Sequence, residues 1–266
     1  MSEEILVDVC ESIMTLTLNR PERKNALNLA MYTTLSESLD RAAKDDEIRV
    51  VFFKGAGDSF TSGNDLSDFA SGASLAEENN PIRRFLFTLV AFPKPVVVAV
   101  HGVAVGIGTT LLLHSDLVYA ASSASFRMPF VNLGLCPEFA SSLLVPRLAG
   151  HAKASEWLLL GEFFSATDAL TGGLVNVIVD DPQTFAMQQC QKLAKQPPAA
   201  LRNAKALIKA PDSAVIMDTI NSEIKVFGEA LKGAEFSEAV TAFFEKRPAN
   251  FSSANFLSKK PANPSN

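Results

Sequence analysis

The sequence predicts an α/β fold, with a core of mixed strands and helices and a C-terminal layer that is only helical. Short apolar runs rich in β-branched residues alternate with amphipathic segments up to about residue 180. Beyond that point every periodic segment has helical spacing, an order typical of an α/β core covered by helices. We therefore expect a core over residues 1–196 and a helical region over residues 197–266. The Asn-, Ser- and Pro-rich tail from Pro248 onward has the composition of a disordered segment.

Seven segments are expected to be strands. Two of them alternate apolar and polar residues around Cys10-Glu11-Ser12, as in a hairpin. The run from Val96 to Val100 is apolar throughout, as in a strand buried on both faces. The expected strands span residues 5–9, 13–18, 48–53, 96–100, 116–120, 125–128 and 175–179.

Helices are expected wherever apolar residues recur every three or four positions. Asn28 is a plausible cap for a helix that begins at Leu29, and residues 165–168 resemble a capping box. Residues 71–80 are polar, small and aperiodic, as in a mobile loop. The other expected helices span residues 83–92, 109–114, 138–146, 153–160, 184–195, 199–209, 213–231 and 235–244.

The glycine-rich turn at residues 101–108 follows the apolar strand and precedes the apolar helix at 109–114. A helix that opens on glycines directs free N–H groups and a positive dipole end into a cleft. Only two acidic side chains, Asp116 and Glu138, occur between Val100 and Ala140. Asp116 opens a strand directly after a helix, where we expect its carboxylate to bond the main chain.

Bulk properties exclude several classes of protein. The formal net charge is −5 and the pI about 5.3, which disfavours binding to nucleic acid or to an anionic membrane. Three widely spaced cysteines favour a reduced, intracellular setting over disulfides. No apolar run reaches the roughly 20 residues that span a bilayer. The acidic N-terminus also lacks a secretion signal, so we expect a cytoplasmic protein.

Familiar cofactor and nucleophile motifs are incomplete. Residues 106–111 (Gly-Ile-Gly-Thr-Thr-Leu) lack the third glycine and the later acidic residue of a dinucleotide site. Neither Tyr32 nor Tyr119 has a lysine four positions later, as a tyrosine-lysine dehydrogenase requires. There is no Gly-x-Ser-x-Gly elbow, and the histidines lack metal-binding spacing. We expect neither a metal nor a redox cofactor.

Three segments in this order resemble the crotonase (enoyl-CoA hydratase/isomerase) superfamily: residues 21–27 (Pro-Glu-Arg-Lys-Asn-Ala-Leu), 60–66 (Phe-Thr-Ser-Gly-Asn-Asp-Leu) and 102–108 (Gly-Val-Ala-Val-Gly-Ile-Gly). The resemblance implies a ββα spiral core, an acyl-CoA substrate and a homotrimer or hexamer. It also implies that the N–H groups of Asn64 and Ile107 form an oxyanion hole, where two fixed donors would stabilise the charge of a thioester enolate. The residues implied to bind the substrate are Lys24, Ala26, Leu27, Ser62, Gly63, Asp65, Leu66 and Gly106.

The departures from the superfamily pattern narrow the expected chemistry. Typical hydratases use two glutamates to activate water, and the corresponding positions here hold Thr110 and Phe130. Residues 133–138 (Leu-Gly-Leu-Cys-Pro-Glu) resemble instead the Δ3,Δ2-enoyl-CoA isomerase branch, in which Glu138 would be the single base. Phe130, Leu135 and Phe139 would surround it and raise its pKa.

Three alternatives stay open. The enzyme could be another member of the superfamily, such as a dienoyl-CoA isomerase or an enoyl-CoA hydratase. The chain could be a non-catalytic acyl-CoA-binding module, which has no need of a base. Glu138 could also be a structural carboxylate in the first turn of a helix, where the dipole favours it.

Overall fold

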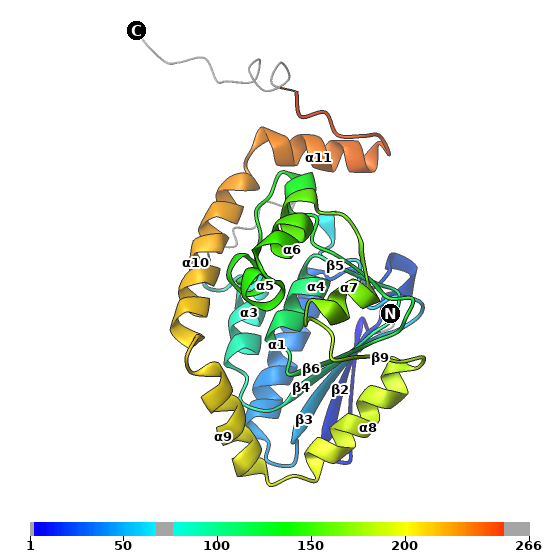
Figure 1. Ribbon diagram of the computed structural model, residues 1–266, viewed down its shortest axis with the longest axis vertical. Coiled ribbons are helices and arrows are strands. Elements are labelled where there is room, and N and C mark those ends of the chain that lie inside the picture. Colours follow the sequence, from blue (N-terminus) through cyan, green and yellow to red (C-terminus); the bar gives the residue numbers. More distant parts are fainter. Residues whose placement is uncertain (1–2, 68–76, 253–266) are drawn as a thin grey trace.

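The structure is a computed structural model that describes residues 3–67 and 77–252, and within these ranges its strands form two sheets (Figure 1). In spatial order the larger sheet contains β1 (Ile5–Cys10), β2 (Ile13–Leu18), β3 (Val50–Gly55), β4 (Val96–Val100), β6 (Leu117–Ala120) and β9 (Val177–Ile178). The smaller sheet contains β5 (Val103–Val105), β7 (Ser125–Arg127) and β8 (Phe164–Ser165). The pairs β1–β2 and β7–β8 are antiparallel and the other pairs are parallel. The α/β class predicted from the sequence is confirmed.

Strand β4 lies in the middle of the larger sheet and is buried on both faces, as its apolar run predicts. Val96, Val98 and Val100 point into a core shared with helices α1 (Leu29–Lys44) and α3 (Pro81–Ala91). Val97 and Ala99 point the opposite way, into a second core with helix α8 (Pro182–Ala194). Figure 1 shows α8 on the right of the sheet and α1 and α3 on its left. Helices on both faces explain why the strand has no polar side.

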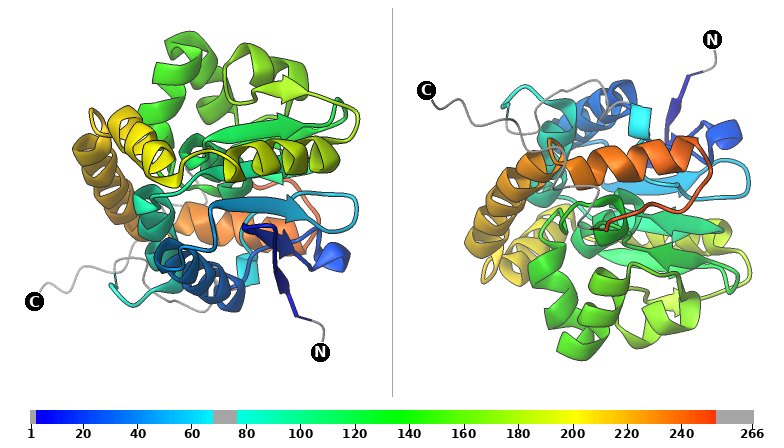
Figure 2. Two further views of the ribbon diagram at one scale, coloured as in Figure 1. Left: turned by 90° about the horizontal axis from the view of Figure 1, so that it is seen from below. Right: turned by 90° about the horizontal axis from the view of Figure 1, so that it is seen from above.

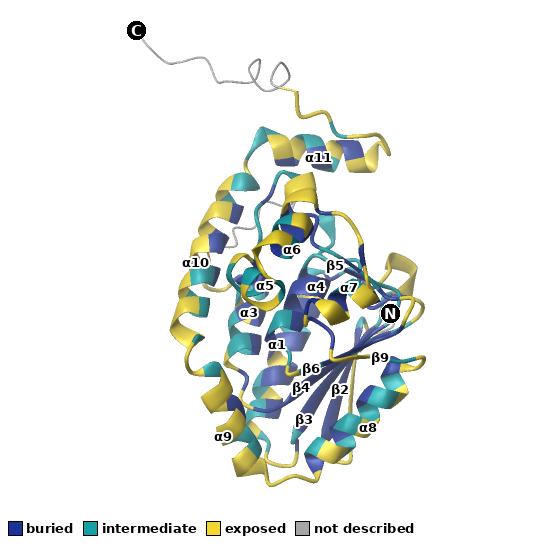
Figure 3. Ribbon diagram, viewed as in Figure 1, coloured by how far each residue is buried: buried dark blue, intermediate teal, exposed yellow. Residues whose placement is uncertain are grey.

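Helices α9 (Pro198–Lys209), α10 (Ser213–Ala230) and α11 (Ala234–Phe244) run along one side of the core and then across its top (Figures 1 and 2). Their outward faces are largely exposed (Figure 3). Lys205 of α9 anchors the layer, because its buried ammonium donates to Asp116 Oδ2 at 2.7 Å and to the Lys94 carbonyl at 2.6 Å. Asp116 also accepts from the Val96 N–H at 2.7 Å, so its predicted main-chain role is confirmed. The division at residue 196 stays a prediction, although α9 begins two residues later.

The remaining helices are short and lie between strands. The caps predicted at Asn28 and at residues 165–168 are both confirmed. In the ranges that the structure describes, no helix is both long and apolar enough to cross a bilayer. These elements are η1 (Pro21–Arg23), α4 (Ile107–Thr110), η2 (Leu111–His114), η3 (Val131–Leu133), α5 (Ser141–Ala149), α6 (His151–Ser155), the π-helical η4 (Glu156–Leu160) and α7 (Ala166–Thr171).

Two expected boundaries are wrong near the glycine turn and near Glu138. The expected helix at 109–114 begins earlier, as α4, and its second half tightens into the 3₁₀ helix η2. The helix expected from Glu138 begins only at Ser141, because Phe139 and Ala140 adopt left-handed backbone angles (φ 58° and 57°) that no helix contains. Glu138 is therefore not a first-turn carboxylate. Most of the loop expected at 71–80, and most of the tail beyond Pro248, lie outside the described residues.

Candidate active site

The glycine turn after β4 leaves one N–H group free at the start of α4. Gly106, with φ 56°, occupies the cap position of this helix and its own N–H bonds the Arg127 carbonyl at 2.8 Å. Thr109 and Thr110 donate to the Gly106 carbonyl, which closes the first turn. Within the part of the chain that the structure describes, the Ile107 N–H donates to no other protein group. It is available to a ligand.

The loop at 60–66 brings a second free donor alongside the first. Thr61 pairs with the edge of β5, donating to Val103 O at 3.0 Å and accepting from Val105 N at 3.1 Å. The approach is so close that a Cβ on Gly63 (φ 92°) would lie 2.7 Å from the Val105 carbonyl oxygen. A Cβ on Gly108 would lie 2.3 Å from the Thr61 methyl carbon. Only glycine fits at these two contact points.

Strand-like pairing with Leu27 sets the direction of the Asn64 N–H. The Leu27 N–H donates to Gly63 O and its carbonyl accepts from Asp65 N, both at 2.8 Å. Because successive amides of an extended chain point in opposite directions, the Asn64 N–H points away from Leu27. Like the Ile107 N–H, it has no protein acceptor among the described residues. Two unpaired donors thus lie on neighbouring segments of main chain.

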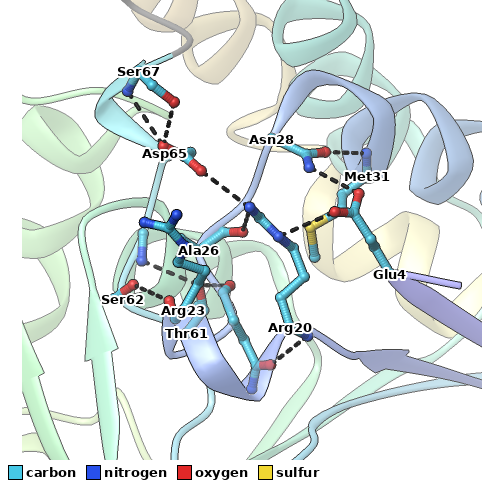
Figure 4. A network of polar contacts seen from close by, with 12 residues as sticks. Glu4, Arg20, Arg23, Ala26, Asn28, Met31, Thr61, Ser62, Asp65 and Ser67 are labelled. Atoms are coloured by element: carbon cyan, nitrogen blue, oxygen red, sulfur yellow. Dashed lines mark hydrogen bonds and ion pairs between the residues drawn. The ribbon is translucent and has the colours of Figure 1, made fainter. Parts of the chain in front are cut away.

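A polar network fixes the loop that supports Asn64 (Figure 4). Arg20 reaches Asp65 Oδ2 at 3.2 Å, Glu4 Oε1 at 3.1 Å and the Ala26 carbonyl at 2.7 Å. Partial burial works against ionisation of Asp65, but hydrogen bonds from Ser67 and Arg20 lower its pKa overall. The Asp65 carboxylate is therefore held by Arg20 and Ser67, and with its lowered pKa it is unsuited to take a proton.

Buried Asn25 ties the same loop to the turn at residues 56–61. Its Nδ2 donates to Ala56 O at 2.8 Å and to Ser59 O at 2.7 Å, while its Oδ1 accepts from the Arg20 N–H at 2.9 Å. The Thr61 hydroxyl donates to the Asn25 carbonyl at 2.7 Å. Asn25 thereby joins the loop that begins at Arg20 to the turn at 56–61, and the donor of Asn64 is held in place before any ligand binds.

Glu138 follows η3 in the chain and reaches back to α4. The Thr110 hydroxyl, one turn after Ile107, donates to Glu138 Oε1 at 2.5 Å. Burial raises the pKa of Glu138 to about 8. Phe130, Leu135 and Phe139 are buried as well, and their expected place around Glu138 stays a prediction. The Thr110 hydrogen bond opposes this rise, and the nearby charge of Glu223 adds to it. A carboxyl with this pKa can both accept and return a proton near neutral pH.

Two adjoining cavities meet at Asn64. The larger, of about 440 Å³, is lined by the segments that carry the Asn64 and Ile107 N–H groups and by Phe130, Phe227 and the α11 residues Phe243 and Phe244. The smaller, of about 20 Å³, lies between Asn64 and Glu138 and is walled by Ile82, Leu86, Ile224 and Phe227. Among the described residues that line either cavity, the carboxylic acids are Asp65 and Glu138. With Asp65 held by Arg20, Glu138 is the acid free to react.

The cavities bring together most of the residues that the sequence placed at the site. Lys24 and Leu27 are not among the lining residues: Lys24 forms an exposed ion pair with Asp58 at 2.5 Å, and Leu27 is buried beneath Asn64. Glu138 lines the smaller cavity with Asn64. The larger cavity is lined by Ala26, Ser62, Gly63, Asn64, Asp65, Leu66, Gly106 and Ile107.

Sequence reasoning missed several groups around the site. Arg23 and Arg127 are the cations of the larger cavity, and their positions follow from loop geometry rather than from a motif. Arg23 makes no ion pair within the described part of the chain, whereas Arg127 donates to Gly161 O at 2.6 Å. The hydrogen bond from Thr110 to Glu138 spans 28 positions of the chain, so no local pattern in the sequence indicates it.

The two sheets and the unpaired N–H groups of Asn64 and Ile107 indicate a class of protein, and comparison with known proteins identifies its family. Residues 8–254 match the family described as enoyl-CoA hydratase/isomerase, and the chain belongs to that family. A solved enoyl-CoA hydratase/isomerase from Pseudoalteromonas atlantica superposes with a TM-score of 0.89 at 40% identity, over 94% of this chain and all of that one. The crotonase-like arrangement expected from the sequence is thus confirmed.

The relatives within the family differ in named activity. The 1,2-epoxyphenylacetyl-CoA isomerase of Escherichia coli K12 is 39% identical over 94% of this chain and 99% of its own length. Enoyl-CoA delta isomerase 2 of Rattus norvegicus is 36% identical over 93% of this chain, which spans only 65% of the rat protein. Hydratases occur at only slightly lower identity. Overall similarity therefore leaves the reaction to be argued from the site.

Proposed function

We propose that the protein is a Δ3,Δ2-enoyl-CoA isomerase, acting on unsaturated acyl-CoA thioesters with Glu138 as its single base. The observation that carries the proposal is one free carboxyl with a raised pKa beside the unpaired N–H groups of Asn64 and Ile107. The two positions that hold glutamates in typical hydratases are Thr110 and Phe130. Neither side chain can activate water as a carboxylate does, so shifting a double bond fits the site better than hydration.

In the proposed reaction the thioester oxygen accepts hydrogen bonds from Asn64 and Ile107. Ionised Glu138 removes a proton from C2 of a 3-enoyl-CoA, and the electron pair moves through the carbonyl onto the oxygen as a dienolate. The two donors stabilise this charge, by about 3–4 kcal/mol for a well-placed one. Protonated Glu138 then returns the proton to C4, the double bond settles between C2 and C3, and the base is regenerated. No water or cofactor is consumed.

The cavity dimensions and charges agree with such a substrate. A volume of about 440 Å³ can take an extended pantetheine arm, and its apolar walls suit the methylene chain. Arg23 and Arg127 at the cavity are candidates to bind CoA phosphates. The cytoplasmic location expected from the sequence stays a prediction, and so does the trimer or hexamer that the family resemblance implies. Exposed apolar residues such as Leu207 and Ile208 on α9 are consistent with an interface.

The proposal is tested with purified protein and two substrates. A 3-enoyl-CoA should give the ultraviolet absorbance of the conjugated 2-enoyl thioester, whereas a 2-enoyl-CoA should lose little absorbance to hydration. Faster hydration than isomerisation would reject the assignment. Binding of both thioesters without turnover would instead identify an acyl-CoA-binding module.

A second candidate follows from the similarity to the E. coli isomerase, which extends over 99% of that protein. Its named substrate, 1,2-epoxyphenylacetyl-CoA, should be included in the same assay series. A kcat/KM for the epoxide more than about tenfold above that for any 3-enoyl-CoA would move the assignment to that reaction.

The pH dependence of kcat/KM should report the ionisation of Glu138. The base acts in its ionised form, so the rate should fall about tenfold per pH unit below the pKa of about 8 and reach a plateau above it. A profile measured from pH 6 to 10 tests this. A flat profile across this range would mean that the base titrates below pH 6, as an ordinary exposed carboxyl does.

Thr110→Val should move that limb to higher pH. The substitution keeps the side-chain shape but removes the donor that favours ionised Glu138. A hydrogen bond to a charged group contributes about 1.5–3 kcal/mol, so an upward shift of about one pH unit or more is expected. Activity on the alkaline plateau should stay near that of wild type. An unshifted limb would show that Thr110 does not control the pKa of Glu138.

A further inference from the structure

The turn that carries Glu138 has an unfavourable backbone. Phe139 and Ala140 are consecutive non-glycine residues with left-handed φ angles of 58° and 57°. A bulky side chain rarely adopts this conformation, which persists only where surrounding contacts hold it. Helix α5 begins directly after the turn, and its cap residue Ala140 has no side-chain acceptor for the first N–H groups. The strain and the missing cap both require a partner from elsewhere in the fold.

Glu223 on helix α10 supplies that partner. Its carboxylate is almost fully buried, with Oε2 accepting from the Ala140 N–H at 2.6 Å. Oε1 accepts from the Ser142 N–H at 3.1 Å and from the Ser142 hydroxyl at 2.5 Å. Both oxygens of the Glu223 carboxylate therefore cap this turn, although Glu223 lies 85 positions after Glu138 in the chain.

His114 holds the opposite side of the turn. Its ring stacks on Phe139 with 3.9 Å between centroids, and Nε2 lies 2.7 Å from the Phe139 carbonyl oxygen. Since a carbonyl can only accept, Nε2 carries the proton. Burial lowers the pKa of His114 to about 3, so the ring is neutral and acts as a fixed donor. Glu223 and His114 together bond both sides of the peptide units that follow Glu138.

We propose that Glu223 is a positioning residue, whose carboxylate holds residues 139–142 in the conformation that directs Glu138 into the cleft. This role rests on the proposed function of Glu138 as the base. It makes the C-terminal helical layer part of the reaction site rather than only a cover or an interface. Apart from Asn64, the residues that line the small cavity with Glu138 come from α3 and α10, so one wall of the cavity beside the base belongs to this C-terminal layer.

The charge of Glu223 gives the role a measurable signature. Together with burial, that charge raises the pKa of Glu138. Arg83 of α3 lines the same cavity but is always charged, and burial raises the pKa of Cys136 to about 11. His114 is neutral throughout pH 6–10, and an arginine side chain such as that of Arg83 is not deprotonated in proteins. Neither group therefore changes its charge in this range. Burial raises the pKa of Glu223 itself, although hydrogen bonds from Ser142 and Ala140 favour its ionised form. A shift of the activity limb to lower pH after substitution of Glu223 would therefore report the loss of its negative charge.

The test compares wild type with Glu223→Gln in isomerase assays across that pH range. On the alkaline plateau kcat should fall about 10²-fold, as expected when a base is displaced by about 1 Å, while KM stays within about threefold. The limb should move to lower pH. Amide hydrogen exchange of residues 140 and 142, which lose a carboxylate acceptor, should quicken. Ser142→Ala removes one of the three hydrogen bonds to the Glu223 carboxylate but keeps its charge, so kcat should fall and exchange should quicken to a smaller degree, without a move of the limb to lower pH.

Ile220→Val is the matched control, since Ile220 is fully buried on α10 one turn before Glu223 and lines neither cavity. It should lower the melting temperature but leave the kcat plateau, the pH limb and exchange at 140–142 unchanged. The proposal is overturned if Glu223→Gln keeps wild-type kcat and exchange, or if Ile220→Val reproduces its effects. Wild-type protein without isomerase activity would instead reject the proposed function, and that result precedes any comparison of variants.

Discussion

Glu138→Gln is expected to lower kcat for isomerisation by about 10²–10⁴-fold while leaving the KM for a 3-enoyl-CoA nearly unchanged. The amide keeps the shape of the side chain and can still accept the Thr110 hydrogen bond, but it cannot take a proton from C2. Arg23 and Arg127, which are proposed to bind the CoA phosphates, line the larger cavity and not the smaller one that holds Glu138, so thioester binding should persist. Steady-state kinetics and equilibrium binding of the thioester provide the two measurements.

The melting temperature of Glu138→Gln shows whether lost activity comes from lost catalysis or from unfolding. The folded pKa of Glu138, about 8, lies above its unfolded value, so ionising this carboxyl destabilises the native state as pH rises above the unfolded pKa. The neutral amide escapes that cost, and the melting temperature at pH 8 should equal or exceed that of wild type. Glu162→Gln, at an exposed glutamate that lines neither cavity, should change neither activity nor stability. Turnover by Glu138→Gln near the wild-type rate would remove Glu138 from the mechanism.

Gly63→Ala should lower kcat by about 10²–10³-fold, the range expected for losing one oxyanion donor. A Cβ at this position would lie 2.7 Å from Val105 O, and the backbone angle of 92° is already unfavourable for alanine. The loop must move away from β5, which displaces the Asn64 N–H from its place beside Ile107. The fall in kcat should exceed any change in thioester binding, because the donor acts mainly on the enolate.

Gly228→Ala is the control for this substitution. Gly228 lies within α10, and a Cβ there would meet no atom within 4 Å. Alanine in a helix is favoured over glycine by about 0.5–1 kcal/mol, so this variant should be slightly more stable and equally active. If Gly63→Ala kept full activity, the Asn64 N–H would not be an oxyanion donor.

The central sheet could be predicted because its signals are local. The apolar run from Val96 to Val100 requires cover on both faces, and its two alternating sets of side chains do meet α1 and α3 on one side and α8 on the other. Asn28 and Ser165 are side chains that cap helices within their own segments. Such features depend on neighbours in sequence, which the pattern displays directly.

The features that sequence reasoning missed depend on distant partners. Nothing in residues 139–140 signals two left-handed conformations, because Phe and Ala ordinarily avoid them; Glu223 and His114 supply the contacts that hold them. Likewise, Asp65 belongs to a motif segment, but its salt bridge to Arg20 spans 45 positions. Glu138 could be singled out in the sequence as one of two acidic residues between Val100 and Ala140, whereas the geometry that directs its carboxyl arises only in the folded chain.

The most direct test of a single base is to follow the transferred proton. A 3-enoyl-CoA carrying deuterium at C2 should yield, in a single turnover, 2-enoyl-CoA with part of that deuterium at C4, because one enclosed carboxyl removes and returns it. Nuclear magnetic resonance or mass spectrometry of the product locates the label. Deuterium at C4 would support Glu138 acting alone. Product with only solvent hydrogen gained at C4, or with water added across the double bond, would contradict it.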